Sequence, residues 1–212
     1  MIANFVFNFF QVNTYLIYSD TGDTIIIDPG FQDQEETNRL FSFIKNNNLD
    51  IKRLLVTHAH LDHILGSHLI FKKYGIRPEI HIKEKDNLSN LCQIAKLMGI
   101  EAESPPEPTN FLTEGDHIYW SGPTIKIIET PGHSPGSISF YLNEIECLFC
   151  GDLIFENSIG RTDLPGGDSH LLIQSIQKIM ENLPDNTILY PGHGPKTTLK
   201  NEIKNNPYLQ NL

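Results

Sequence analysis

The chain has 212 residues, of which 39% are hydrophobic and 20% charged, a composition that suits a globular protein with a full core. Its formal net charge of −10 argues against nucleic-acid binding, which needs a basic surface. No apolar run reaches the roughly 18 residues of a membrane span. A secretory signal would require a positively charged residue near the N-terminus, but the first Lys or Arg in this chain is Arg39. The three cysteines do not suggest a disulfide framework. Together these features predict a cytoplasmic protein that binds neither nucleic acid nor membrane.

The N-terminal half has the pattern of alternating strands and helices. Apolar residues at alternate positions, Phe5, Phe7 and Phe9, predict a first strand whose rings lie in the core, although such a stripe can also form a membrane or partner surface. Two of the expected helices should end at Gly75 and Gly99. Beyond the first strand, the expected strands cover 15–18, 25–28, 51–57 and 79–82, and the expected helices cover 34–48, 64–74 and 85–97.

The C-terminal half repeats this alternation after a proline-rich segment at 103–108. That segment marks a connection between two halves of one domain over 1–212, because neither half alone would be large. Strands are expected over 117–120, 125–129, 138–142, 147–150 and 187–190, with a helix over 171–183 and a short terminal helix before Pro207. Cys147 and Cys150 fall within one of these strands, which favours a strand segment over a zinc ribbon. The predicted fold class is α/β or α+β, with sheets covered by helices.

The densest chemical signal is a cluster of histidines and one aspartate directly after the strand that ends near Thr57. Two histidines two positions apart on extended backbone project to the same side, so both rings can reach one metal ion. If a helix starts near Asp62, the following side chains point elsewhere, towards a second ion. A polar loop with Asp62 as the helix N-cap would explain the aspartate, but not the three histidines. The cluster consists of His58, His60, Asp62 and His63.

Three further positions share one pattern, a His or Asp beside glycine at the end of a predicted strand. They are His133, Asp152 and His193. Glycine lets the backbone pass close to a site, and strand ends are where loops present functional groups. Other histidines stand alone and are expected to be surface or packed residues, namely His68, His81, His117 and His170.

The order His-x-His-x-Asp-His, a lone His, a lone Asp and a final His resembles the metallo-β-lactamase superfamily. The resemblance runs from Asn13-Thr14-Tyr15 and Asp28-Pro29-Gly30 to the C-terminal helix. It implies a four-layer αββα sandwich of two mixed β-sheets flanked by helices, with the site along one edge. It also implies that Asp28 supports the site without binding metal, as side chains that orient ligand rings do.

The same resemblance implies the ligands of two divalent metal ions. One ion would be bound by His58, His60 and His133, the other by Asp62, His63 and His193, with Asp152 bridging them. Asp62 would also act catalytically by orienting the nucleophile. Imidazole and carboxylate ligands without cysteine suit zinc, with iron or manganese as alternatives. Two such ions can share a hydroxide that attacks an electrophilic carbonyl or phosphorus.

A loop after Asp152 narrows the resemblance to two branches. Gly160-Arg161-Thr162-Asp163 resembles type II glyoxalases, which are hydroxyacylglutathione hydrolases, and also persulfide dioxygenases. The first implies hydrolysis of a small-molecule thioester such as hydroxyacylglutathione, by attack of a metal-bridging hydroxide. The alternative is a mononuclear-iron persulfide dioxygenase that uses His58, His133 and Asp152.

The loop leaves two interpretations of Arg161 open. Its side chain would bind a substrate carboxylate or would only pair with Asp163. Gly166-Gly167-Asp168 is expected to form a turn followed by a helix N-cap.

Only a short segment follows His193, whereas full-length type II glyoxalases carry a helical C-terminal domain that supplies much of the glutathione site. The resemblance therefore leaves the thiol carrier open, and the sequence leaves the oligomeric state open.

Overall fold

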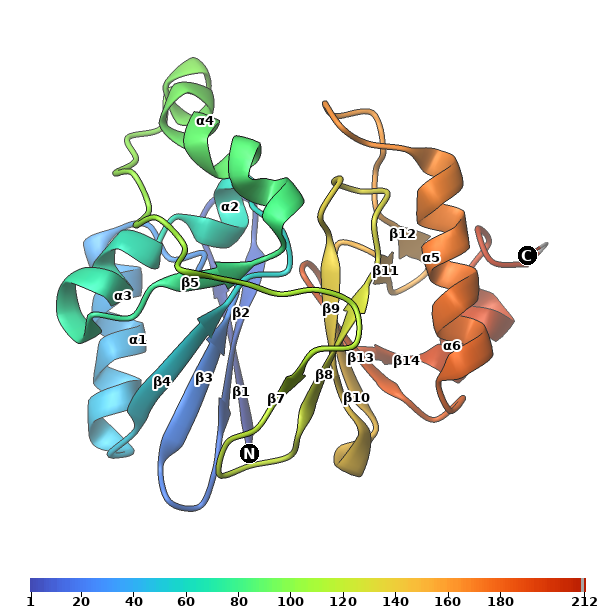
Figure 1. Ribbon diagram of the computed structural model, residues 1–212, viewed down its shortest axis with the longest axis horizontal. Coiled ribbons are helices and arrows are strands. Elements are labelled where there is room, and N and C mark those ends of the chain that lie inside the picture. Colours follow the sequence, from blue (N-terminus) through green and yellow to red (C-terminus); the bar gives the residue numbers. More distant parts are fainter. Residues whose placement is uncertain (211) are drawn as a thin grey trace. The chain divides into compact units, whose positions relative to one another are not determined.

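The computed structural model describes residues 1–210 and 212, and the chain divides into two compact units. The N-terminal unit comprises Met1–Phe111 and Trp120–Gly122, and the C-terminal unit comprises Leu112–Tyr119 and Pro123–Leu212. Each unit combines one large mixed β-sheet with helices (Figure 1). The predicted mixed α/β class is confirmed.

The sheet of the N-terminal unit is antiparallel at one edge and parallel at the other, with strand order β1-β2-β3-β4-β5-β6. β1, β2 and β3 pair antiparallel, and β3 to β6 pair parallel. The parallel strands end on the same side, so the segments after β3 and β4 lie at one edge of this sheet. The strands are β1 (Ile2–Phe7), β2 (Val12–Tyr18), β3 (Asp23–Ile27), β4 (Asp50–Leu55), β5 (Pro78–Ile80) and β6 (Asn110–Phe111).

The first strand is shorter than its apolar alternation predicts. Phe5 and Phe7 are buried as expected, but Phe9 is 90% exposed, so its assignment to the core is wrong. β1 ends at Phe7 because Asn8 and Gln11 adopt left-handed backbone conformations, with φ of 53° and 58°, and turn the chain into β2. Such conformations end the alternation of faces on which the prediction depends.

The helices of this unit cover its sheet with apolar faces. Leu40 and Ile44 of α1 pack in one cluster with Leu16, Ile26 and Leu54 of the sheet. The helices of the unit are α1 (Gln34–Asn46), α2 (Leu61–Ile64), α3 (Ser67–Tyr74), the 3-10 turn η1 (Ile82–Glu84) and α4 (Lys85–Leu97).

One helix that the sequence predicts as continuous is divided into α2 and α3. The break falls at Gly66, whose backbone N–H donates to the carbonyl of Pro29 at 2.7 Å. A Cβ at Gly66 would lie 2.4 Å from the ring of Phe31, so glycine allows the close approach. A contact with a distant loop thus takes the backbone hydrogen bond that Gly66 would donate within a continuous helix.

The C-terminal unit has the strand order β14-β13-β10-β9-β8-β7, in which only β10 and β13 pair parallel. Strands β11 and β12 form a separate two-stranded sheet. The strands are β7 (His117–Ile118), β8 (Ile125–Glu129), β9 (Ile138–Leu142), β10 (Cys147–Gly151), β11 (Ile154–Phe155), β12 (Ser158–Ile159), β13 (Ile188–Pro191) and β14 (Thr197–Thr198).

Helices α5 (Ser169–Asn182) and α6 (Leu199–Asn205) belong to this unit, with a 3-10 turn η2 (Asn143–Ile145) before β10. Leu172 and Ile176 of α5 pack against Leu148 and Leu189 of the sheet in one buried cluster. Asp168 caps α5 by accepting hydrogen bonds from two backbone N–H groups, which confirms the predicted N-cap. The Cys147-x-x-Cys150 segment lies in β10, as expected.

Among the described residues, we find no helix whose length and apolarity would suffice to cross a bilayer.

Candidate metal centre

The segment after β4 gathers four of the predicted ligands within the N-terminal unit. His60 lies on extended backbone, and α2 begins at the next residue, so the expected turn into a helix near Asp62 is confirmed. The ring of His58 lies 4.6 Å from that of His60 and 4.1 Å from that of His63, centroid to centroid. The N-cap of α2 is His60, so the alternative interpretation of Asp62 as the cap is wrong.

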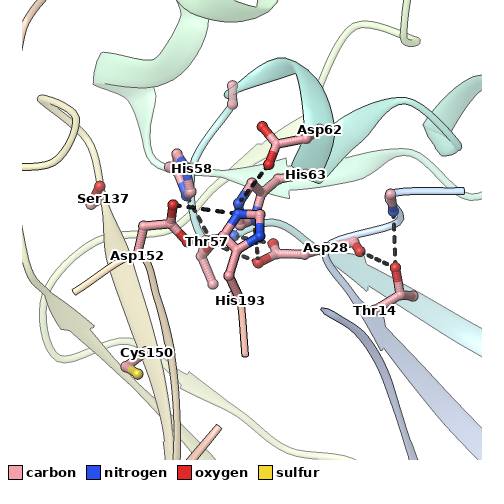
Figure 2. A network of polar contacts seen from close by, with 12 residues as sticks. Thr14, Asp28, Thr57, His58, Asp62, His63, Ser137, Cys150, Asp152 and His193 are labelled. Atoms are coloured by element: carbon pink, nitrogen blue, oxygen red, sulfur yellow. Dashed lines mark hydrogen bonds and ion pairs between the residues drawn. The ribbon is translucent and has the colours of Figure 1, made fainter. Parts of the chain in front are cut away.

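Asp28, directly after β3, fixes the orientation of His63 (Figure 2). Its carboxylate accepts from the backbone N–H of Thr57 at 2.7 Å, from the Thr57 hydroxyl at 2.7 Å and from His63 Nδ1 at 2.9 Å. Because a carboxylate only accepts, the proton of the His63 ring lies on Nδ1. The lone pair on Nε2 is then the one that can bind a metal ion.

Thr57 extends this control to His58. Its hydroxyl donates to Asp28, so its oxygen accepts from His58 Nδ1, at 3.1 Å. The proton of the His58 ring is therefore also on Nδ1, and Nε2 carries the lone pair. One buried carboxylate thus orients two predicted ligands, one of them directly and the other through a hydroxyl.

Glu84 holds the backbone between the first two histidines. Its carboxylate, which is fully buried, accepts from the backbone N–H of Ala59 at 2.8 Å. This bond holds the backbone at the residue between His58 and His60, whose ring centroids lie 4.6 Å apart. Glu84 was not predicted from the sequence, because nothing near it distinguishes it from a surface glutamate at a helix start.

The C-terminal unit brings the other three predicted ligands together. Asp152 and His193 follow β10 and β13, whose parallel pairing places both residues at the same sheet edge. His133 follows β8, and its Nδ1 donates to the backbone carbonyl of Arg161 at 2.7 Å, which again leaves Nε2 as the ligand atom. Asp152 Oδ2 lies 3.5 Å from His133 Nε2 and 3.6 Å from His193 Nε2.

The spacing of these atoms fits metal ligation better than direct hydrogen bonding. In the N-terminal unit, Asp62 Oδ2 lies 3.5 Å from His63 Nε2, which repeats the spacing around Asp152. Hydrogen bonds between such groups are about 2.7–2.9 Å long. Two atoms that bind one ion at about 2.1 Å with a tetrahedral angle lie roughly 3.4 Å apart. Imidazole nitrogens with fixed protons, carboxylate oxygens and this spacing are those expected of ligands of divalent metal ions.

Arg161 contributes to the site in a way that the sequence does not reveal. Its guanidinium forms two hydrogen bonds of 2.7 Å with Asp163, and both side chains are exposed. The hydrogen bond from Arg161 is the main cause that lowers the pKa of Asp163 to about 2. The loop ion pair is therefore formed, while the backbone carbonyl of Arg161 orients His133. A substrate contact of the side chain stays a prediction.

The isolated histidines have local contacts of their own. His68 Nδ1 donates to the carbonyl of Leu65 at 2.9 Å, and His81 caps η1 by accepting from the Lys83 N–H. His117 and His170 are exposed, on β7 and α5. These positions agree with the expectation of surface or packed residues.

Comparisons with known proteins agree with the geometry. Residues 7–193 match the model of the metallo-β-lactamase superfamily. The chain is 37% identical over 204 residues to the hydroxyacylglutathione hydrolase GloC of Haemophilus influenzae, covering 94% of this chain and 93% of that protein.

Two solved structures are similar over almost the whole chain. The BLEG-1 B3 metallo-β-lactamase superposes with a TM-score of 0.90 and 36% identity, covering 99% of both chains. TTHA1623 in a di-iron-bound form superposes with a TM-score of 0.87 and 32% identity, covering 98% of this chain and 100% of the other. Their fold is the one that the sequence predicts.

Proposed function

This chain belongs to the metallo-β-lactamase superfamily, and from that premise we propose that it hydrolyses thioesters of the hydroxyacylglutathione type with two metal ions. The superfamily and the His and Asp residues together make it a metal-dependent hydrolase. The finer proposal is carried by one observation, a relative named hydroxyacylglutathione hydrolase that is 37% identical along 94% of the chain.

The metal ligands are proposed from the order of motifs along the chain. His58, His60 and His133 would bind one ion, Asp62, His63 and His193 the other, and Asp152 both. In this proposal residues 1–212 act as one catalytic domain in the cytoplasm, where thiols such as glutathione are kept reduced. The fixed protons on the Nδ1 atoms of three of these histidines support the assignment.

When bound, two divalent ions supply a nucleophile at neutral pH, because they lower the pKa of a coordinated water towards about 7. The residues of the chain orient the ligand side chains and accept a hydrogen bond from the attacking water. Asp62 is the proposed catalytic residue, because a carboxylate has two oxygens. One oxygen can bind an ion while the other accepts a hydrogen bond from the attacking water and so directs it.

The chemistry of the leaving group favours a thioester. A thiol has a pKa near 8.5, so its thiolate leaves near neutral pH without being protonated. An amide substrate such as a β-lactam needs a proton on the departing nitrogen, and therefore a positioned acid. Hydrolysis of a thioester requires only the nucleophile and stabilisation of the negative charge that develops on the carbonyl oxygen.

Metal analysis and a substrate panel test this proposal. The protein is purified without added metal, and its zinc, iron and manganese are quantified. Lactoylglutathione, a small uncharged thioester, glutathione persulfide with oxygen uptake, and a β-lactam are then assayed in parallel. We expect close to two equivalents of metal, mainly zinc, and turnover of the thioesters.

Other outcomes would replace the proposal. One equivalent of iron with oxygen uptake on the persulfide would mean the dioxygenase. Cleavage of the β-lactam alone would mean a lactamase, the activity in the name of BLEG-1. A metal content near zero after growth in supplemented medium would overturn the dinuclear assignment itself.

A further inference from the structure

A buried threonine holds the turn that carries Asp28. Thr14 lies on β2 and has no exposed surface. Its hydroxyl donates to the carbonyl of Asp28 at 2.6 Å and accepts from the backbone N–H of Gly30 at 3.0 Å (Figure 2). One hydroxyl therefore uses both of its hydrogen-bonding functions to bind the residues on either side of Pro29.

Asp28 needs this support because its backbone is in an unusual conformation. Its φ is 51°, in the left-handed region, which is uncommon for any residue other than glycine and only less unfavourable for aspartate and asparagine. A return to an ordinary backbone conformation would turn the Asp28 side chain away from Thr57 and His63. Asp28 is also 2% exposed, so a misdirected carboxylate would lack water as an alternative partner.

The hydrogen bonds continue from this turn to two ligand rings. Thr14 holds the backbone of Asp28, the Asp28 carboxylate orients His63, and Thr57 passes the orientation on to His58. β2 itself is fixed by antiparallel pairing with both β1 and β3, so the Thr14 hydroxyl has a rigid base. A strand that contributes no predicted ligand thus sets the direction of two of them.

We propose that Thr14 is a positioning residue of the metal centre, whose hydroxyl sets metal affinity by holding Asp28 in its left-handed conformation. The inference rests on the proposed function only in that metal ions bind. Its test measures metal binding and needs no substrate, so an error about the thioester would leave the result intact.

Four variants isolate the hydroxyl from packing. Thr14→Val replaces the hydroxyl with a methyl group and keeps the shape of the side chain. Thr14→Ala removes the hydroxyl without adding a methyl group in its place. Thr14→Ser keeps the hydroxyl and removes only the methyl group. Thr24→Val is the matched control. Thr24 is also fully buried, on β3, and its hydroxyl donates only to the carbonyl of Gly22, at 2.9 Å.

Zinc affinity is measured on metal-free protein by competition with a chromophoric chelator, and the visible spectrum of the cobalt form reports ligand geometry. Loss of groups that orient ligands typically weakens metal binding about 10–100-fold. Because Thr14 acts through Asp28, we expect roughly a tenfold loss in Thr14→Val and Thr14→Ala, with an altered cobalt spectrum. Thr14→Ser should bind within about twofold of the natural protein.

The control decides between positioning and general stability. Thr24→Val should lower the unfolding temperature and leave zinc affinity and the cobalt spectrum unchanged. If a Thr14 variant does not fold without metal, the rate at which a chelator removes zinc from the loaded protein is compared instead, and it should rise about tenfold. Unchanged affinity or release in both Thr14→Val and Thr14→Ala, or an equal loss in Thr24→Val, would overturn the inference.

Discussion

A buried carboxylate on the C-terminal helix offers a quantitative test of the structure. Glu202 of α6 is fully buried and accepts four hydrogen bonds. One oxygen accepts from the Thr197 hydroxyl at 2.6 Å and from Asn201 Nδ2 at 2.8 Å. The other accepts from the backbone N–H of Asn157 at 2.8 Å and from Asn206 Nδ2 at 3.0 Å. These bonds tie α6 to the β11–β12 hairpin.

The substitution Glu202→Gln keeps the shape and replaces one accepting oxygen with a donor. In the better of its two orientations, the new amide nitrogen faces Thr197, whose hydroxyl can rotate to accept, and Asn201, whose amide nitrogen cannot. At least one hydrogen bond to a charged acceptor is lost, which is worth about 1.5–3 kcal/mol, and the remaining bonds lose their charge. Relief from burying a charge offsets part of this cost. We expect a destabilisation of about 2–4 kcal/mol.

The assay is urea unfolding followed by circular dichroism, with amide hydrogen exchange to locate the effect. Exchange should accelerate at Asn157 and in α6, because these amides share the network. Glu181→Gln is the control, since Glu181 lies exposed on α5 and the chemical change is the same. It should alter the free energy of unfolding by less than about 0.5 kcal/mol. If Glu202→Gln is as mild as the control, the network does not hold the hairpin as described.

Three further predictions concern the C-terminal unit. Asp152→Ala should remove both metals, because Asp152 Oδ2 lies 3.5 Å from a nitrogen of His133 and 3.6 Å from a nitrogen of His193, which are proposed to bind different ions. His193→Ala should remove mainly one metal. Elemental analysis measures the metal content, and a full complement in Asp152→Ala would disprove the bridge. Arg161→Lys should lower kcat/KM about ten- to a hundredfold on a glutathione thioester and spare a small uncharged one, whereas equal effects on both would leave only the ion pair. Carbon NMR should find the Asp163 pKa at about 2. Arg161→Gln should raise this pKa, because the ionised carboxylate loses the hydrogen bonds from the guanidinium that stabilise it. An unchanged Asp163 pKa in Arg161→Gln would show that Arg161 does not lower it.

Much of the fold could be predicted because local patterns determined it. The helix expected at 85–97 matches α4, and the strands expected at 125–129 and 138–142 match β8 and β9. In these segments apolar periodicity and the glycine or proline nearby point to the same structure. Phe9 and Gly66 were mispredicted because a turn and a tertiary contact override the local pattern there.

Candidate ligands could be selected from the sequence, but the groups that orient them could not. The seven ligand candidates are His and Asp residues at strand ends, where residue type and position both carry a signal. Glu84 and the carbonyl of Arg161 act through partners that lie 25 and 28 residues away in sequence. Contacts between residues so far apart in sequence are created by the fold, and no spacing in the sequence predicts them. Thr14 lay within a recognised motif, yet its role needed the structure.

The three acceptors that hold the Nδ1 protons differ in electronic character, and this would make the rings unequal as ligands in the proposed metal centre. His63 donates to a carboxylate, His58 to a hydroxyl and His133 to a backbone carbonyl. A charged acceptor draws the proton more strongly and leaves more electron density on the opposite nitrogen, which raises the basicity of the ligand. His63 is therefore the strongest electron donor of the three. If these rings bind the two ions as proposed, two chemically identical ions would experience different ligand fields, and scarce metal would fill the two positions unevenly.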